Sequence, residues 1–475
     1  MSGLPLLEGV LRYIKEKNLY FCMPGHKGGK GFRTTEIGKK FLDNLAQFDI
    51  TEVDGVDNLH NAEGIIKESQ ELLSAYYGSK KSYFLVNGST SGNLAMIFSS
   101  FEEGDKIIVE RNCHRSIFNG IIMRKLKPVY IKNKINEKFN APLSIDMEHF
   151  LCTLENNKDA KGIILTYPNY YGICLDLKRV VEEAQKYNMK VLVDSAHGAH
   201  FGVNSKLPPH AVKLGVHMAV MSSHKTLPSF TQTAYLHIGN HEIDEERVDF
   251  YVSSFLSTSP SYMLMCSMDY GRYYLQENGE KDYEKLIELC TIYRDKINKL
   301  KGFYILGTDD INQGESIDLT RYILNVEKGY SGHKLLNYLR EDGIQCEMSD
   351  SQNVVLIFSP FNEEKEFEKL YECLRKCNLK KLKEQYKKSF IGEMPKMAIE
   401  PYKVMGKLKI KVNLKDSLGK ISARAVVPYP PGIPVVMPGE IITSEVIDMI
   451  KYNLENNIDV MGLDEKSKDI EVLDF

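Results

Sequence analysis

Between residues 82 and about 240, the sequence alternates short apolar runs with segments of helical periodicity. The apolar runs, which we expect to be β-strands, are SYFLVNG, KIIVERN, PVYIKN, GIILTYP, KVLVDSA, HMAVMSSH and TAYLHIG. Strands that alternate with helices are typical of an α/β domain built on a mostly parallel sheet. Because these runs are apolar almost throughout, we expect helices to cover both faces of the seven-stranded sheet.

The length of the chain, 475 residues, exceeds that of a usual single domain. Near residue 280 the strand alternation gives way to a long charged helix, ENGEKDYEKLIELCTIYRDKINKLKG. We therefore expect an N-terminal segment over 1–80, a large domain over 81–290 and a smaller α+β C-terminal domain over 291–475. In the large domain, DLKRVVEEAQKYN is the clearest helix, and Asp176 is placed to cap its N-terminus.

The composition of the chain indicates which binding partners and which cellular compartment to expect. The net charge is −3, so nothing favours binding to nucleic acid or to an anionic membrane, and a small-molecule substrate is expected. The N-terminus lacks the pattern of a signal peptide, and no apolar stretch reaches the roughly 18 residues of a membrane span. The 9 cysteines are scattered, which is typical of reduced thiols in a cytoplasmic protein. Neither Cys373 with Cys377 nor His197 with His200 has the further ligands of a metal site, so no metal is expected.

Two glycine-containing segments are possible phosphate sites. In NGSTSGNLAMIFSSF a helix follows a strand, so the N–H groups of Thr90 and Ser91 would face an anion at the positive end of the helix dipole. An ordinary helix cap has the same pattern. The segment MPGHKGGKGF lacks the GK[ST] ending of a P-loop, and we interpret it as a shaped loop.

Two charged residues end predicted strands. In KVLVDSA, the predicted strand ends at Asp194. Lys225 directly follows the next predicted strand, HMAVMSSH. Ligands of open α/β sheets bind at this edge. A lysine there forms a Schiff base with an aldehyde cofactor if desolvation or neighbouring positive charge lowers its pKa. Each residue alone is compatible with an ion pair or a surface lysine, but the order phosphate cup, aspartate, lysine indicates a cofactor site.

This order resembles the aspartate-aminotransferase fold, which is fold type I of the pyridoxal-phosphate (PLP) enzymes. Several strings are similar to those of the Orn/Lys/Arg decarboxylase family, and more so to its short Gram-positive members without an N-terminal wing domain. These strings are MPGHKGG, NGSTSGN, RNCHRS, VDSAHGAHF, SSHKTLPSFTQTA, STSPSY and PYPPGIPVVMPGE. The resemblance implies a PLP-dependent decarboxylase that converts lysine, ornithine or arginine into CO2 and a polyamine-type amine.

The resemblance also implies roles for individual residues. Lys225 would bind PLP as a Schiff base, Asp194 would pair with the protonated pyridine nitrogen, and His114 would stack on the ring. Further residues would surround the cofactor: Thr90, Ser91, Ser222 and His224 at the phosphate, Ala196 beneath the ring, and His197 near the cofactor oxygen or the substrate carboxylate.

Two more assignments concern the edges of the site. Thr258, in LSTSPSY, would reach the phosphate of a neighbouring subunit, which implies a homodimer or a higher oligomer with shared sites. Glu440 ends a proline-rich loop and would meet the distal cation of a basic amino acid, or else cap the helix that follows.

Three questions stay open at this stage. An aminotransferase or lyase of the same fold is the alternative, and Arg424 is placed to clamp the α-carboxylate of its substrate. A non-catalytic protein on this scaffold is disfavoured by the intact set of Lys225, Asp194 and His114. HKTLPSFTQTA is slightly more similar to lysine or general basic-amino-acid decarboxylases than to arginine decarboxylases.

The lysine-rich stretch 374–390 is predicted to be a solvated helix.

Overall fold

The computed structural model describes residues 3–239, 243–386, 388–389, 391–429, 432–455, 458–464 and 466–474. The seven predicted strands form one sheet in the order β2-β11-β10-β9-β7-β3-β4. Their bounds are β2 (Lys81–Leu85), β3 (Lys106–Glu110), β4 (Lys127–Ile131), β7 (Gly162–Thr166), β9 (Lys190–Asp194), β10 (Met218–Met221) and β11 (Ala234–Ile238). β11 is antiparallel to β10 and β2, and the other neighbours are parallel. The predicted mostly parallel sheet is therefore confirmed.

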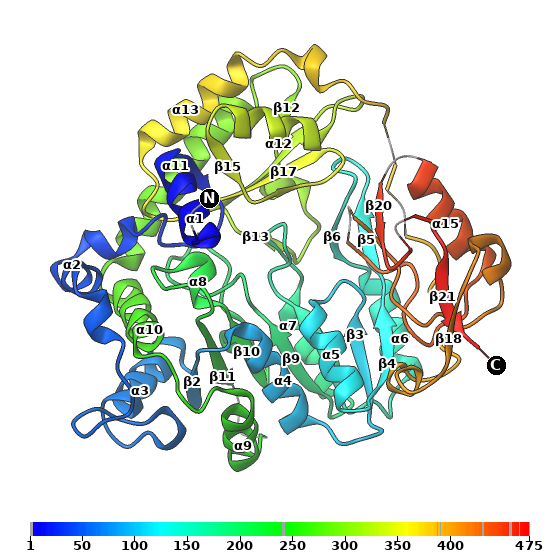
Figure 1. Ribbon diagram of the computed structural model, residues 1–475, viewed down its shortest axis with the longest axis horizontal. Helices are drawn as coiled ribbons and strands as arrows, with labels where there is room; N and C mark the ends of the chain where they lie inside the picture. The colour runs from blue at the N-terminus through cyan, green and yellow to red at the C-terminus, as the bar shows by residue number, and fades with distance from the viewer. Residues whose placement is uncertain are drawn as a thin grey trace.

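Helices pack on this sheet (Figure 1). The helices around it are α4 (Gly88–Ser100), α5 (Arg115–Met123), α6 (Met147–Asn156), α7 (Leu177–Gln185), α8 (Ser223–Thr226) and α9 (Glu245–Phe255), of which α5 and α9 pack mainly on α4. α4 contacts β2, β9, β10 and β11, and α7 contacts β9. Nearly every residue of the strands is buried, as expected when both faces are covered. The side chain of Asp176 accepts a hydrogen bond from the N–H of Arg179, so the predicted cap of α7 is confirmed.

A second sheet follows a long helical segment. That segment joins α10 (Tyr262–Tyr274) to α11 (Glu280–Ile297) through a π-helical turn over Leu275–Gly279. The second sheet is antiparallel, in the order β12-β14-β17-β16; α11 and α12 contact its strands, and α13 packs on α11. The bounds are β12 (Phe303–Ile305), β14 (Arg321–Val326), β16 (Met348–Ser349), β17 (Asn353–Ile357), α12 (Gly332–Glu341) and α13 (Glu364–Arg375).

The N-terminal segment touches both sheets. It contains α1 (Pro5–Lys15), β1 (Leu19–Phe21), α2 (Glu36–Asp43) and α3 (Ile65–Tyr77). β1 pairs in parallel with β15 (Ile344–Cys346), beside the second sheet, whereas α3 contacts β2 of the first. Short strand pairs lie between the main elements: β5 (Asn133–Asn136) with β6 (Ala141–Ile145), and β8 (Ile173–Cys174) with β13 (Ser316–Ile317).

The last part of the chain has a hydrophobic core of its own, built from Leu414, Val426, Val435, Val436, Ile442, Val446, Ile447, Met449, Ile450, Ile470 and Val472. It contains α14 (Pro401–Val404), β18 (Lys409–Val412), β19 (Val427–Tyr429), α15 (Ser444–Glu455), β20 (Asp459–Met461) and β21 (Ile470–Leu473). Figure 1 shows this part beside β3, β4 and α6, and α14 contacts α5. The second sheet, in contrast, shares a hydrophobic core with the large sheet, and the domain boundaries at residues 80 and 290 remain a prediction.

The helix predicted over the lysine-rich stretch is wrong. α13 ends at Arg375, and a single 3₁₀ turn, Leu379–Leu382, follows it. The side chain of Asn378 accepts from the N–H of Lys380 and starts this new turn, so the two helical pieces do not join. Lysines that would stack one turn apart also repel each other.

The glycine-rich loop after residue 23 supports the segment that carries Lys225. The N–H of Gly25 donates to the carbonyl of His224 at 2.8 Å. A Cβ on Gly25 would lie 2.5 Å from the carbonyl carbon of Thr226. The predicted shaped loop therefore packs its backbone directly on the lysine segment.

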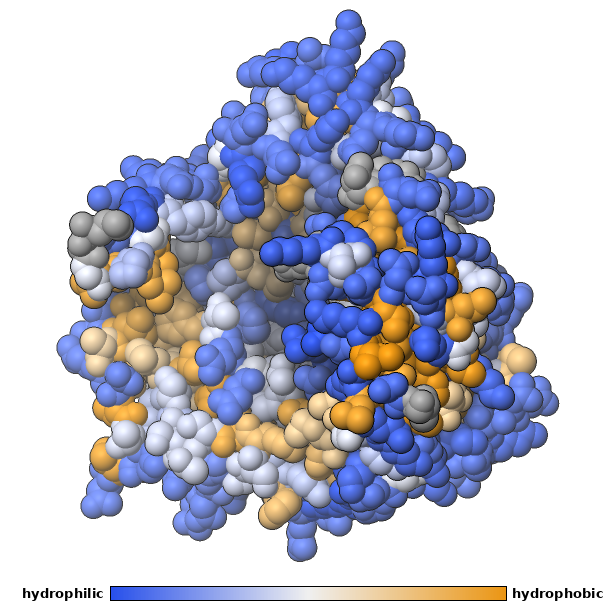
Figure 2. All heavy atoms as spheres, turned by 45° about the vertical axis from the view of Figure 1, so that its right-hand side comes forward, coloured by the Kyte–Doolittle hydropathy of each residue, from blue (hydrophilic) through white to orange (hydrophobic). Residues whose placement is uncertain are grey.

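Near the middle of the face shown in Figure 2, the surface is hollowed between polar side chains and apolar patches.

Within the described part of the chain, no helix combines the length and the apolar character needed to cross a bilayer. Among the same residues, no group of three His, Cys, Asp or Glu side chains is arranged to hold a metal ion.

Gly25→Ala tests the contact between the glycine-rich loop and the lysine segment. We expect a loss of about 1–3 kcal/mol in the free energy of unfolding, because the new methyl group overlaps backbone atoms that cannot rotate away. Denaturant titration measures this loss. Gly406→Ala is the control, since a Cβ there meets nothing within 4 Å. Equal midpoints for the two variants would contradict the close packing.

Candidate active site

A cavity of about 570 Å³ opens at the carboxyl ends of β7, β9 and β10. It brings together most of the residues predicted for the cofactor site: Thr90, His114, Asp194, Ala196, His197, Ser222, His224 and Lys225. The aromatic side chains of Tyr170, Tyr171 and Tyr429 also line it. The volume is in the range of small-molecule sites, and the position is the ligand-binding edge of an open α/β sheet.

One end of the cavity is built from the start of α4. Among the described residues, no side chain caps this helix, so its first N–H groups are available to an anion. Gly88 has a φ of 72° and lets the chain turn there without a Cβ. The hydroxyls of Ser89 and Ser222 lie 2.6 Å apart beside the exposed Thr90. This donor set fits a phosphate group.

Two of the predicted phosphate residues have supporting contacts instead of open donors. The hydroxyl of Ser91 is turned back to the carbonyl of Gly88 at 2.8 Å, and Ser91 does not line the cavity. His224 donates through Nδ1 to the carbonyl of Thr233 at 2.9 Å, which leaves its Nε2 as an acceptor when the ring is neutral. Ser91 therefore shapes the helix start, whereas His224 lines the cavity itself.

The opposite end of the cavity is organised by Asp194. Its carboxylate is buried and accepts from the amide of Asn93 at 2.8 Å and from the N–H of Ala196 at 3.1 Å. Asn93 also donates to the hydroxyl of Ser116, which lies 2.7 Å from Nδ1 of His114. The backbone N–H of Ser116 donates to that same Nδ1. Nδ1 of His114 is therefore an acceptor, and the proton of the neutral ring sits on Nε2.

A second carboxyl group lies behind Asp194. Glu110 ends β3 and accepts from Asn133 at 2.9 Å and from the N–H of Thr166 at 2.9 Å. Burial raises the pKa of Glu110 to about 7, and the charge of Asp194 acts in the same direction. Glu110 was not predicted from the sequence, where it is one more acid at a strand end.

Lys225 lies on α8, and its Nζ is 3.0 Å from Nε2 of His197. Burial lowers the pKa of the Lys225 amine, and the charge of Arg321 lowers it further, while Asp194 opposes the shift. The pKa of His197 lies well below its ordinary value, again mainly because of burial and then because of the charge of Lys225. The sequence prediction named desolvation and positive charge as the conditions for a Schiff-base lysine, and both are present here.

Arg321, at the start of β14, was missed by the sequence analysis. It is buried, and its Nη2 lies 3.3 Å from Nδ1 of His197, while its Nη1 donates to the carbonyl of Tyr170 at 2.7 Å. Asp318 lies 3.8 Å from its Nε. Although burial opposes the shift, the charges of His200 and Arg321 lower the pKa of Asp318 to about 2. No local motif marks Arg321, because its partners come from the other sheet.

Arg424 does not reach the cavity. Its side chain is exposed and pairs with Glu471 at 2.9 Å. The prediction that Arg424 clamps a substrate carboxylate is therefore wrong, because its side chain pairs with Glu471 on β21, outside the cavity. The arginine that lines the cavity is Arg115, exposed at the start of α5.

Glu440 is also absent from the cavity. Its two carboxylate oxygens accept from Nη1 and Nη2 of Arg111 at 2.5 and 2.8 Å, and the N–H of Met437 donates to it at 2.7 Å. It does not cap the next helix either, since α15 begins at Ser444. The expected contact with a substrate cation is thus corrected: the proline-rich loop reaches the cavity through Tyr429 and Gly432.

Thr258 lies exposed in the loop between α9 and α10 and does not line the cavity of its own chain. Its predicted role in a neighbouring subunit stays a prediction.

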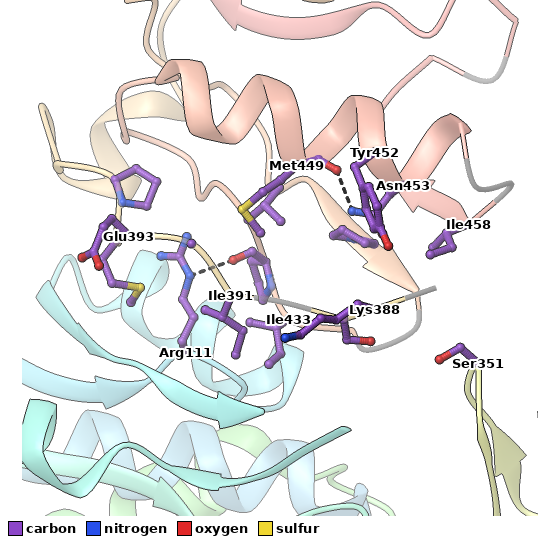
Figure 3. Close-up of a pocket in the computed structure, with 17 residues that line it drawn as sticks. Arg111, Ser351, Lys388, Ile391, Glu393, Ile433, Met449, Tyr452, Asn453 and Ile458 are labelled. Carbon is purple, nitrogen blue, oxygen red and sulfur yellow. Dashed lines mark hydrogen bonds between the residues drawn. The ribbon is translucent and has the colours of Figure 1, made fainter. Parts of the chain in front are cut away.

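Arg111 ties the proline-rich loop to the end of the large sheet. Its Nε donates to the carbonyl of Pro434 at 3.0 Å, the contact drawn as a dashed line beside Arg111 in Figure 3. The pocket in that view lies between β3 and α15, and its volume is about 40 Å³. This is far below the roughly 300–1,000 Å³ of ordinary small-molecule pockets, a range that includes the cavity at Lys225. The cavity at Lys225 is the better site for a substrate.

The chain was compared with known proteins. The family models described as "Orn/Lys/Arg decarboxylase, major domain" and "Orn/Lys/Arg decarboxylase, C-terminal domain" match residues 4–322 and 380–464. The chain belongs to the Orn/Lys/Arg decarboxylase family. It is 32% identical over 466 residues to arginine decarboxylase of Bacillus subtilis (strain 168), covering 96% of this chain and 95% of the relative. It is 33% identical over 467 residues to arginine decarboxylase of Halalkalibacterium halodurans, with coverages of 96% and 95%.

The fold is that of a solved decarboxylase. The crystal structure of the lysine decarboxylase LdcF of Francisella novicida matches with a TM-score of 0.78 and 22% identity, covering 99% of this chain and 81% of that one. The predicted PLP fold type I and the predicted enzyme class, an amino-acid decarboxylase, are confirmed, and so is PLP as the cofactor of the family.

Glu440→Gln tests the buried ion pair with Arg111. We expect a loss of about 3–5 kcal/mol in the free energy of unfolding, because Arg111 keeps its charge in a buried site without its carboxylate partner. Denaturant titration measures the loss. Glu471→Gln is the matched control, since it breaks the exposed pair with Arg424 and should cost only about 0–1 kcal/mol. If Glu440→Gln kept the wild-type midpoint and only raised KM, Glu440 would be a substrate ligand after all.

Proposed function

We propose that this protein decarboxylates a basic amino acid on PLP held at Lys225, and that arginine is the first substrate to test. The observation that carries the proposal is the single cavity that joins an uncapped helix start, the carboxylate of Asp194 and the desolvated amine of Lys225. These are the groups needed for the phosphate, the ring nitrogen and the aldehyde of this cofactor.

When bound, PLP supplies an electron sink for the pair of electrons left behind by CO2. The chain's own residues orient and protonate. The hydroxyls of Ser89, Thr90 and Ser222 would hold the phosphate together with the start of α4. Asp194 would keep a proton on the ring nitrogen, and Asn93 fixes the carboxylate of Asp194 in place.

Decarboxylation needs a carboxylate that is poorly solvated before CO2 leaves. The buried Arg321 is occupied by Tyr170 and His197, so it offers little to a substrate carboxylate. Tyr170, Tyr171 and Tyr429 reduce the access of water to the cavity. The proton that replaces CO2 at Cα would come from Lys225 or from a histidine of the cavity, and Nε2 of His197 lies 3.0 Å from the lysine Nζ.

The choice of arginine is supported by the relatives, not by the pocket. The two relatives described above, with 32% and 33% identity, are named arginine decarboxylase. The slight similarity of HKTLPSFTQTA to lysine decarboxylases points the other way. Lysine and ornithine therefore belong in the same assay, and the product of each is the corresponding polyamine-type amine.

Lys225→Ala tests the cofactor site. We expect wild-type protein with PLP to absorb visible light and release CO2 from a basic amino acid, and Lys225→Ala to lose both while it keeps its thermal midpoint. The assay compares CO2 release from arginine, lysine, ornithine and neutral amino acids. Lys206→Ala, on an exposed lysine paired with Glu284, is the control. Release only from neutral or acidic amino acids would refute the proposed substrate class.

The aminotransferase alternative gives a different product. Arg115 at the rim is the described cavity arginine that such an enzyme would use for the α-carboxylate. Formation of a 2-oxo acid from the same amino acids, with no CO2, would favour this alternative.

We further propose that the protein is a cytoplasmic homodimer or a higher oligomer that shares its sites between subunits. The apolar side chains at and around α1 support this, because none of the residues of α1 is buried. The exposed apolar residues are Leu4, Leu6, Leu7, Val10, Leu11, Tyr13 and Ile14. An apolar face of this size is normally covered. The exposed Thr258 is free to reach a partner's phosphate, and the 9 cysteines are unpaired, as in a reducing compartment.

The oligomer is tested by light scattering after size-exclusion chromatography. We expect wild-type protein to have at least twice the mass of one chain, and Leu7→Glu with Leu11→Glu to shift it towards the monomer. Leu408→Glu changes an equally exposed leucine elsewhere and should leave the mass unchanged. A monomeric wild-type protein that still retains PLP would contradict shared sites.

A further inference from the structure

Two contacts link Arg321 to His197 and His197 to Lys225. The donors and acceptors of these three groups decide which atom carries each proton. A guanidinium group has N–H donors and no acceptor. The contact of 3.3 Å between its Nη2 and Nδ1 of His197 therefore requires that Nδ1 carries no proton. A neutral imidazole then has its proton on Nε2.

The next contact in the chain has one direction only. Nε2 of His197 lies 3.0 Å from Nζ of Lys225. Because Nε2 carries the proton, it donates, and Nζ must accept through a lone pair. An ammonium group has three donors and no lone pair. Only the neutral amine completes this hydrogen bond.

We propose that Arg321 acts as a positioning residue that fixes His197 as the Nε2–H tautomer and thereby holds Lys225 as a neutral amine. The inference rests on the proposed function, in which Lys225 binds the aldehyde of PLP. A neutral amine forms the bond to the carbonyl carbon, and the carbonyl oxygen leaves as water, whereas an ammonium has no electron pair for that bond.

The surroundings of Arg321 suit this role. Nη1 donates to the carbonyl of Tyr170, and a carboxylate oxygen of Asp318 lies 3.8 Å from Nε. Asp318 is itself held by His200 at 3.3 Å and by the hydroxyl of Thr320 at 2.6 Å. The fork of the guanidinium is thus aimed at His197 by contacts on its other arms.

Other charged groups face the lysine as well. Those acting on Lys225 or on His197 are Asp194 from the end of β9, His114 from the start of α5, His224 on α8, Glu347 beside β16, and Arg321 itself. Asp194 and Glu347 favour the ammonium form, and Arg321 and burial oppose it. Burial therefore outweighs the two carboxylates, and the cation of Arg321 acts in the same direction as burial.

The test uses protein freed of PLP and no substrate, so it is independent of whether decarboxylation occurs. A trace of isotopically labelled acetic anhydride reacts with neutral amines only, and peptide mass spectrometry follows the labelling of Lys225 against pH. In wild-type protein we expect half-maximal labelling below the ordinary lysine pKa of about 10.4. Arg321→Gln should reduce the labelling at neutral pH by about tenfold, which is one pKa unit.

Two further variants separate charge from general damage. Arg321→Lys keeps the cation without the fork and should label between wild type and Arg321→Gln. Arg272→Gln removes another buried arginine, paired with Asp269 on α10, and should label as wild type does. Wild-type labelling in a folded Arg321→Gln protein would overturn the proposal.

The tautomer of His197 gives a readout that needs no variant of Arg321. Nitrogen-15 NMR of labelled histidines, assigned with His197→Gln, should show a bare Nδ1 and a protonated Nε2 at neutral pH. A proton on Nδ1 of His197 would overturn the proposal, and this result decides if Arg321→Gln fails to fold.

Discussion

The parallel pairing of β9 with β7 and β10 is the constraint on which the site depends. It places Asp194 opposite Thr166 on one side and opposite Val220 on the other, and the N–H of Ser195 continues the ladder to the carbonyl of Val220. Because parallel strands end at a common edge, residues far apart in the sequence emerge together there. The lysine segment after β10 and the loop of His197 after β9 are neighbours for this reason alone.

Two buried ion pairs lie around this edge of the sheet. Arg111 with Glu440 and Arg321 with Asp318 are buried, and each arginine also donates to a backbone carbonyl. Such pairs add little to stability by themselves, since desolvation offsets the attraction. Their effect here is geometric: one holds the proline-rich loop and the other holds His197.

The sequence predicted the residues that belong to continuous strings at the ends of strands. Asp194, Lys225 and the start of α4 follow apolar runs directly, and the position of a strand end can be read from one segment. The structure shows why Arg321 and Asn93 escaped: their roles come from partners 124 and 101 residues away. Glu440 was assigned wrongly for the same reason, because the arginine that binds its carboxylate lies 329 residues earlier.

His197 contacts residues from both sheets. Lys225 and His197 follow strands of the large sheet, whereas Arg321 begins a strand of the small one. A shift of the small sheet that withdrew Arg321 would free Nδ1 of His197, and Nε2 would then be able to accept from an ammonium group on Lys225. The protonation state of the lysine therefore depends on the packing of the two sheets. Burial by itself lowers the pKa of an amine. The direction of the hydrogen bonds adds a geometric requirement, namely a lone pair on Nζ of Lys225 that faces Nε2 of His197.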